Sequence, residues 1–137
     1  MSAPPLDAAD VDDRLPRLYL VVFFGGMVGA AARLGLTAAL PSGTIVLGVL
    51  AANLFGALAL GILFEVMREH RLGGTSRWAF WGPGALGAFT TFSALQMEVA
   101  DLMRGGDLWR GVLYLVASIA LGVPLAALGR WLVVRVR

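Results

Sequence analysis

Residues 82–95 read GPGALGAFTTFSAL, and this stretch decides the fold. It lies inside an apolar segment, 78–97, that is long enough to cross a bilayer core as a helix. Three glycines, a proline, two threonines and a serine occur in the stretch, and phenylalanines flank the threonine pair. Glycine and proline weaken a helix, and backbone groups released inside a membrane need other partners. The stretch therefore predicts a broken membrane helix, a feature that usually lines a cavity or holds an ion.

The composition is typical of a membrane protein. Of the 137 residues, 58% are hydrophobic and 15% are charged, and the mean hydropathy is +0.79. Cysteine is absent and His70 is the one histidine, which excludes disulfides and metal sites built on thiols or histidine clusters. All eleven basic residues are arginines, and all but Arg33 lie between apolar blocks, which indicates membrane flanks and no nucleic-acid partner. No motif of a soluble catalytic module is present, so we do not expect an enzyme.

Four apolar segments predict an all-α membrane protein with four transmembrane helices, the third of them broken. A polar tail at 1–17 precedes the membrane domain, 18–137, and is expected to be disordered or to lie on the surface. A turn at 41–43 and a polar loop at 65–77 are predicted between spans. Because four short helices cannot easily enclose a pathway, we expect the chain to oligomerise. The predicted spans are 18–40, 44–64, 78–97 and 108–134.

Polar and small residues in the first two spans need an explanation. Arg33 either extends to the membrane interface or faces a vestibule that attracts anions. Asn53 lies near the centre of its span, and is either a clamp between helices or a hydrogen-bond donor that lines a pore. Gly25, Gly26 and Gly29 give the first span a small-residue face that is suited to close helix packing.

Polar residues near the third span and within the fourth also have two interpretations. Glu98 is either an ordinary charge at the end of its span or a gate at the mouth of a pathway. Tyr114, Ser118 and Gly122 recur every four residues and so share one helix face. That face provides either contact between helices or a polar track for a solute.

The arginines are distributed unequally between the two sides of the membrane. The side with both termini and the 65–77 loop holds eight, and the other side holds two. The positive-inside rule therefore predicts a multi-pass protein of the cell membrane with both termini in the cytoplasm. The eight are Arg14, Arg17, Arg68, Arg71, Arg77, Arg130, Arg135 and Arg137, and the two are Arg104 and Arg110.

The motifs together resemble the CrcB/Fluc family of fluoride channels, over nearly the whole chain after the tail. The threonine–threonine–phenylalanine–serine element after a glycine break, inside a span, is specific, and the order of all the motifs matches. The resemblance implies an antiparallel dimer of four-helix subunits with two fluoride pathways. The matching residues are Gly25, Gly26, Gly29 and Arg33, then Asn53 and Gly56, then Gly87 to Ser93 and Glu98, and finally Tyr114 and Ser118.

The resemblance also implies roles for individual residues. A central structural Na⁺ would be held by the backbone carbonyls of Gly87 and Thr90. Asn53 and Ser93 would donate hydrogen bonds to fluoride, and Phe92 would offer its positively polarised ring edge. The remaining positions that match the pathway are Tyr114 and Ser118 on a polar track, Arg33 in a vestibule and Glu98 near the end of the pathway.

The sequence departs from the family pattern at several positions, and Leu95 is the most important. It occupies the position of a second pore phenylalanine, and leucine has no aromatic edge. The arginine bias favours one fixed orientation, whereas a chain that pairs with itself antiparallel must insert both ways. We therefore predict a heterodimer with an oppositely oriented paralogue; the alternative is a dual-topology homodimer. The other departures are Leu34, Val49, Ala88 and Gly122.

Three functions follow from these patterns. The first is a passive fluoride channel that exports fluoride and lowers its cytoplasmic concentration. The second is a four-span drug/proton antiporter, which requires a carboxylate within the membrane. No acidic residue is predicted in the core of a span, which disfavours that function. The third is a non-conducting assembly subunit of a heterodimeric channel.

Overall fold

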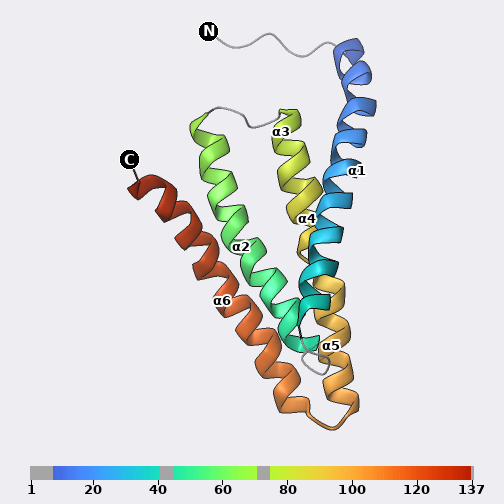
Figure 1. Cartoon of the computed structure of the whole chain (residues 1–137), viewed down its shortest axis with the longest axis vertical. Helices are drawn as coiled ribbons and strands as arrows, with labels where there is room; N and C mark the ends of the chain where they lie inside the picture. The colour runs from blue at the N-terminus through green and yellow to red at the C-terminus, as the bar shows by residue number, and fades with distance from the viewer. Residues whose placement is uncertain (1–7, 41–44, 71–74, 137) are drawn as a thin grey trace.

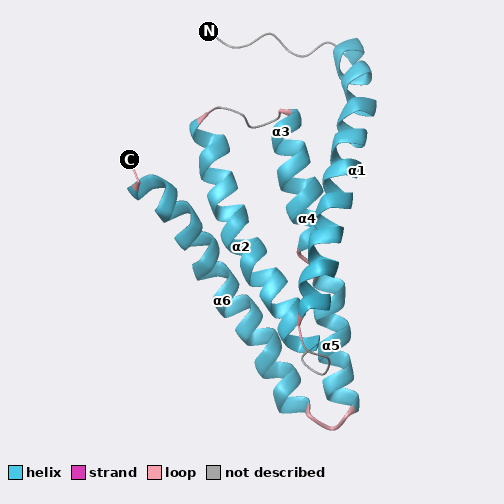
Figure 2. Cartoon of the chain, in the orientation of Figure 1, coloured by secondary structure: helices cyan, strands magenta, loops and turns pink. Residues whose placement is uncertain are grey.

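The regular structure of this chain is helical throughout residues 8–40, 45–70 and 75–136, which are the residues that a computed structural model describes (Figure 2). No strand occurs in these ranges. The elements in order are α1 (Ala8–Ala39), α2 (Ile45–Glu69), α3 (Ser76–Ala79), the π-helix η1 (Phe80–Leu86), α4 (Gly87–Phe89), α5 (Phe92–Arg104) and α6 (Leu108–Arg135).

These elements form four rods that lie alongside one another (Figure 1). Three rods contain single helices that are long and apolar enough to cross a membrane, at Leu15–Ala39, Leu47–Glu69 and Leu108–Arg135. The remaining rod is a helix made of several elements, with α3, η1 and α4 in its first half and α5 in its second. The start of α1 and the ends of α2 and α6 lie at one end of the molecule, and the α5–α6 connection lies at the other (Figure 1). The predicted four-helix architecture with a broken third helix is confirmed.

Two helices are longer than the predicted spans. α1 begins at Ala8, so residues 8–17, which were expected in a disordered or surface tail, are helical; the rest of that tail lies outside the described residues. α2 continues to Glu69, so the first part of the predicted 65–77 loop is also helical. The predicted turn at 41–43 lies outside the described residues.

α1 packs against η1 through its glycines. A Cβ atom on Gly25 would overlap the Phe80 carbonyl oxygen, and one on Gly29 would overlap the Ala85 carbonyl oxygen. A Cβ atom on Gly26 would make only an ordinary contact. The two backbones therefore approach as closely as glycine permits, and the predicted packing face is confirmed at Gly25 and Gly29.

α2 and α6 are joined by a reciprocal contact of the same kind. A Cβ atom on Gly61 of α2 would overlap the Ala126 carbonyl oxygen, and one on Gly129 of α6 would overlap the carbonyl oxygen of Leu58. This contact fixes the relative position of the two helices, and hence of the polar residues that they carry on either side of it.

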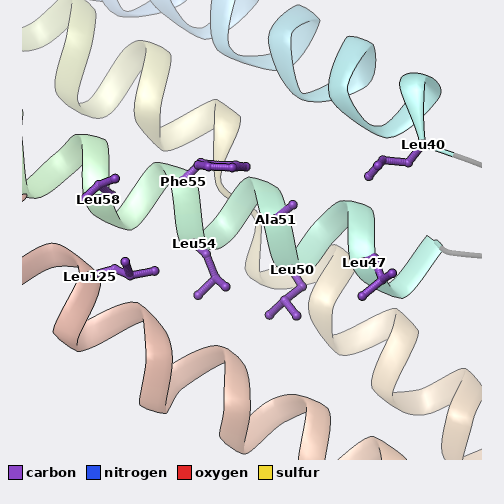
Figure 3. A pocket seen from close by; sticks show the side chains of 8 residues that line it. All are labelled: Leu40, Leu47, Leu50, Ala51, Leu54, Phe55, Leu58 and Leu125. Atoms are coloured by element: carbon purple, nitrogen blue, oxygen red, sulfur yellow. The ribbon is translucent and has the colours of Figure 1, made fainter.

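An apolar hollow of about 420 Å³ opens between the end of α1, α2 and α6 (Figure 3). Its lining holds no polar side chain that could bind an ion, so we place the functional site elsewhere. The lining residues are Leu40, Leu47, Leu50, Ala51, Leu54, Phe55, Leu58 and Leu125.

We expect Gly29→Ala to lower the thermal unfolding midpoint of the purified protein. The added methyl group would overlap the Ala85 carbonyl and force α1 away from η1; overpacking of this kind costs about 1–3 kcal/mol. Gly35→Ala is the matched control in the same helix, because a Cβ atom there has no neighbour within 4 Å. Alanine favours a helix over glycine by about 1 kcal/mol, so the control should keep or raise the midpoint. Equal midpoints for both variants would contradict the close contact.

Candidate functional site: the break in the third membrane helix

The threonine pair interrupts the composite helix. α4 ends at Phe89, and Thr90 (φ −80°, ψ 153°) and Thr91 (φ −149°, ψ 123°) are extended before α5 begins at Phe92. Pro83 lies further upstream, inside the π-helix. The helical rod therefore continues through the glycine–proline segment as a wider turn and breaks only at the two threonines.

The threonine hydroxyls explain why the chain breaks here. Thr90 Oγ1 donates a hydrogen bond to the Leu86 carbonyl at 2.9 Å, at the end of the first half. Thr91 Oγ1 accepts the N–H of Ala94 at 3.2 Å, which caps the start of α5. The same hydroxyl lies 3.2 Å from Ser93 Oγ, within hydrogen-bond distance. Local sequence thus ends one helix and begins the next.

Asn53 holds the break from α2. Its Nδ2 donates to the Thr91 carbonyl at 3.0 Å, and its Oδ1 accepts the Thr91 N–H at 2.8 Å. The Thr91 N–H therefore finds an acceptor that the interrupted helix does not supply in an apolar environment. The Thr91 carbonyl, which as the N-cap carbonyl already accepts the first hydrogen bond of α5, gains a second donor. Nearby on α2, Gly56 leaves room for Thr90. A Cβ atom at Gly56 would overlap Cγ2 of Thr90. Asn53 is thus a clamp between helices, and the clamp uses one of the two N–H donors of its Nδ2.

The clamp by Asn53 and the cap by Thr91 leave two backbone carbonyls without the N–H donors that they would have in a continuous helix. In an unbroken helix, the Thr91 N–H would bond to the Gly87 carbonyl, and the Ala94 N–H would bond to the Thr90 carbonyl. These donors bond instead to Asn53 Oδ1 and to Thr91 Oγ1. Unwound backbone carbonyls of this kind coordinate Na⁺ in broken membrane helices, so the donors present fit such an ion.

A second polar contact lies further along α5. Tyr114 of α6 donates its hydroxyl to Glu98 Oε2 at 2.5 Å, and both residues are buried. Glu98 Oε1 is also buried and has no hydrogen-bond partner in the described part of the chain. Glu98 is therefore a residue of the subunit interior, next to the predicted end of the third span.

A small apolar core includes Tyr114 of the Glu98–Tyr114 pair. Val49, Leu95 and Tyr114 are buried and form one cluster, with Leu95 only 4% exposed. Val49 lies one turn before Asn53 on α2, and both Val49 and Leu95 are departures from the family pattern. Leu95 points into its own subunit, whereas Phe92, one turn earlier, is 65% exposed.

The other predicted site residues lie around these groups. Ser93 is exposed at the start of α5, and Ser118 is buried one turn after Tyr114 on the predicted α6 face. Arg33 is half-buried near the end of α1, and its Nε has no hydrogen-bond partner among the described residues. No hydrogen bond within the described ranges joins Arg33 to the clamp or to Glu98. The structure thus brings Ser93 close to the clamp and leaves Arg33 apart.

Glu65 is a buried polar residue that the sequence predicts to lie in the 65–77 loop. It lies within α2, is 1% exposed, and is paired with Arg68 and Arg130. The spacing of Glu65 and Arg68 by three residues was the available signal, because such residues are neighbours on a helix. Glu65 and Glu98 are thus buried acidic residues that directly follow the predicted ends of the second and third spans.

We expect Leu95→Phe to lower the thermal unfolding midpoint, because the larger ring must fit against Val49 and Tyr114 in a closed core; overpacking typically costs about 1–3 kcal/mol. Adding Val49→Ala should restore part of this loss, since it vacates volume beside the new ring. Leu113→Phe is the control, because Leu113 is exposed on α6. Strictly additive effects of the two core changes would mean that Val49 and Leu95 do not share one core.

Comparison with known proteins identifies the family. The sequence model described as "CrcB-like protein, Camphor Resistance (CrcB)" matches residues 20–130. A fluoride-specific ion channel FluC of Thermus thermophilus is 38% identical over 115 residues, which cover 81% of this chain and 90% of that protein. One from Hyphomonas neptunium is 37% identical over 123 residues, which cover 86% of this chain and 96% of that protein. The clamp, the broken helix and the Glu98–Tyr114 pair all lie in the matched range, and the chain belongs to the CrcB-like family.

Proposed function

We propose that this chain is a subunit of a fluoride-selective channel that passively exports fluoride and lowers its cytoplasmic concentration. The observation that carries the proposal is the break at Thr90 and Thr91, clamped by Asn53 within a bundle of membrane-scale helices. The relatives from Thermus thermophilus and Hyphomonas neptunium are named fluoride-specific ion channels, which supports fluoride as the solute.

Residues near the break offer the donors that a small, strongly hydrated anion needs to replace its water. Asn53 keeps a second Nδ2 N–H beyond the one in the clamp. Ser93 has a hydroxyl, and the exposed Phe92 ring presents a positively polarised edge. Because Phe92 and Ser93 lie on the surface of the subunit, we place the pathway between this chain and a second one. A narrow lining of this kind selects fluoride over chloride by size and field strength.

Further polar residues would extend the pathway. Tyr114 and Ser118 form the track along α6, and Glu98 stands near the end of the pathway. Arg33 would attract anions from a vestibule, because its guanidinium is half-buried and one of its nitrogen atoms has no hydrogen-bond partner in the described ranges.

A structural Na⁺ would bind at the break through the carbonyls of Gly87 and Thr90. Both residues line a hollow of about 370 Å³ beside the break. Two carbonyls are too few to replace the water shell of a cation, so the site would need a second chain that contributes its own pair. The positive charge would lower the cost of holding an anion nearby.

The partner in this proposal is a second four-span subunit in the opposite orientation. The start of α1 and the ends of α2 and α6 lie at the same end of the molecule (Figure 1). The arginine bias of the sequence, eight against two, supports a cytoplasmic location for that end. The same bias favours a paralogue of opposite topology over a second copy of this chain. A dual-topology homodimer is the alternative.

One observation favours the drug/proton antiporter as a second candidate. Glu98 is a buried carboxylate with one oxygen unpaired among the described residues, as a proton-exchanging site requires. Its hydrogen bond to Tyr114 and the names of the relatives favour the channel instead.

We expect liposomes that contain the assembled protein to release fluoride, as measured with a fluoride electrode, and to retain chloride. A proton gradient should change the rate only through the membrane voltage, because a passive channel couples no second ion. Exchange of cations for protons would establish the antiporter, and the absence of any flux would leave the assembly subunit as the function.

The same assay tests Asn53. Asn53→Asp keeps an acceptor for the Thr91 N–H but loses the donor to its carbonyl and places a negative charge on the pathway. Fluoride flux should fall by about tenfold or more, the factor that about 1.4 kcal/mol of added barrier produces. Gln96→Glu is the matched control, because it makes the same chemical change at an exposed position of α5. Unchanged flux in Asn53→Asp would remove Asn53 from the pore.

Purification tests both the partner and the ion. We expect this chain alone to be poorly dimeric on size-exclusion chromatography, and to form a stable dimer when it is produced with an oppositely oriented paralogue. The dimer should lose thermal stability when choline replaces Na⁺, because choline is too large for the carbonyl site. A stable, fluoride-conducting dimer of this chain alone would overturn the heterodimer, and equal stability in choline would overturn the Na⁺ site.

A further inference from the structure

A polar cavity far from the break lies between the C-terminal ends of α2 and α6. Its volume is about 310 Å³, and it combines two arginines, one carboxylate and one tryptophan. These helix ends lie at the end of the molecule that also holds the start of α1 (Figure 1). The lining residues are Glu65, Arg68, Ala127, Arg130, Trp131 and Val134.

Glu65 orients both arginines without neutralising them. Its Oε1 accepts hydrogen bonds from Nε and Nη2 of Arg68, and its Oε2 accepts one from Nε of Arg130 at 3.4 Å. The residues that line the cavity carry two positive charges and one negative charge, and Glu69, one turn after Glu65 on α2, also interacts electrostatically with Arg68. The carboxylate is almost fully buried, whereas both arginine side chains are more than half exposed. Nη1 of Arg68 and both Nη atoms of Arg130 make no hydrogen bond within the described ranges, so they are available to a ligand.

Aromatic rings place this cluster at the level of the lipid headgroups. The Arg130 guanidinium lies 5.5 Å from the centre of the Phe64 ring, and Phe64 stacks edge-on against Trp78. Trp131 lines the cavity and stacks with Arg135 at 5.0 Å. Tryptophan gathers at the boundary between the bilayer core and water, which favours headgroups over acyl chains as the surroundings of the two arginines.

From these contacts we infer that Arg68 and Arg130 bind the phosphate of an anionic phospholipid, with Trp131 at the glycerol level. The planar guanidinium group matches a phosphate through two parallel hydrogen bonds. Basic cavities between membrane helices at the cytoplasmic side bind anionic headgroups in this way. The neighbouring α6 surface offers exposed Leu128 and Leu132 to the acyl chains. A free phosphate ion shares this chemistry, but the cavity lies where lipid phosphates are concentrated.

The test uses the full-length protein, in the assembly in which it is stable, in detergent. Adding phosphatidylglycerol should raise the thermal unfolding midpoint more than adding phosphatidylcholine, and Arg130→Gln should lose most of that difference. Arg104→Gln is the control, because Arg104 lies in an exposed pair with Asp101 at the opposite end and should keep the difference. Inorganic phosphate with phosphatidylcholine should give no rise. An equal rise with inorganic phosphate, or an unchanged difference in Arg130→Gln, would overturn the lipid site.

Glu65→Gln separates lipid binding from a purely structural role. It removes the negative charge but keeps both arginines, so the phosphatidylglycerol effect should persist or grow even if the basal midpoint falls. If the arginines serve only to compensate Glu65, this variant should respond to the lipid no more than Arg130→Gln does. Native mass spectrometry of the same variants counts the phosphatidylglycerol molecules retained and gives an answer even where a variant is less stable.

Discussion

The structure depends on how the backbone at one interruption of a helix keeps its hydrogen bonds inside an apolar bundle. Thr91 is extended, so its N–H has no partner along the helix, and Asn53 supplies that acceptor while donating a further hydrogen bond to the Thr91 carbonyl. An unpaired buried backbone group costs about 1–3 kcal/mol, so the break is tolerable only where such an amide is available. Around it, close packing is achieved by glycines, which let α1 reach η1 and α2 reach α6. The Gly87 and Thr90 carbonyls and the exposed Phe92 then lie at or next to the break that Asn53 and the threonine hydroxyls stabilise.

Much of the architecture could be predicted because a bilayer allows so few backbone structures to span it. Apolar length gives the number of helices, and the composition of 82–95 gives the position of the break to within a few residues. The ends of the helices could not be predicted, because α1 and α2 continue beyond their apolar segments with polar residues. The direction of Leu95 depends on where the two extended residues fall, since each residue of a helix turns the next side chain by about 100°.

The polar contacts show the same limit. The sequence identifies Asn53 as a residue that needs a hydrogen-bond partner. Which backbone group it pairs with depends on the tertiary structure. Glu65 illustrates this further, because its second arginine, Arg130, lies 65 residues away in the chain. Two kinds of buried carboxylate result: Glu65 is paired with two cations, and Glu98 accepts a hydrogen bond from a neutral hydroxyl. A sequence that shows only the positions of acidic residues cannot distinguish them.

The π-helix before the break determines the angular position, about the helix axis, of the residues that follow it. A π turn closes from residue i to i+5, and so holds one more residue than an α turn. If Phe80–Leu86 were to tighten into an ordinary α-helix, the threonine pair would rotate by about 100° for each residue of difference, away from Asn53. The wide turn lies where the glycines of α1 meet the Phe80 and Ala85 carbonyls. The length of this short segment, more than the identity of most of its side chains, therefore determines which helix face presents the break.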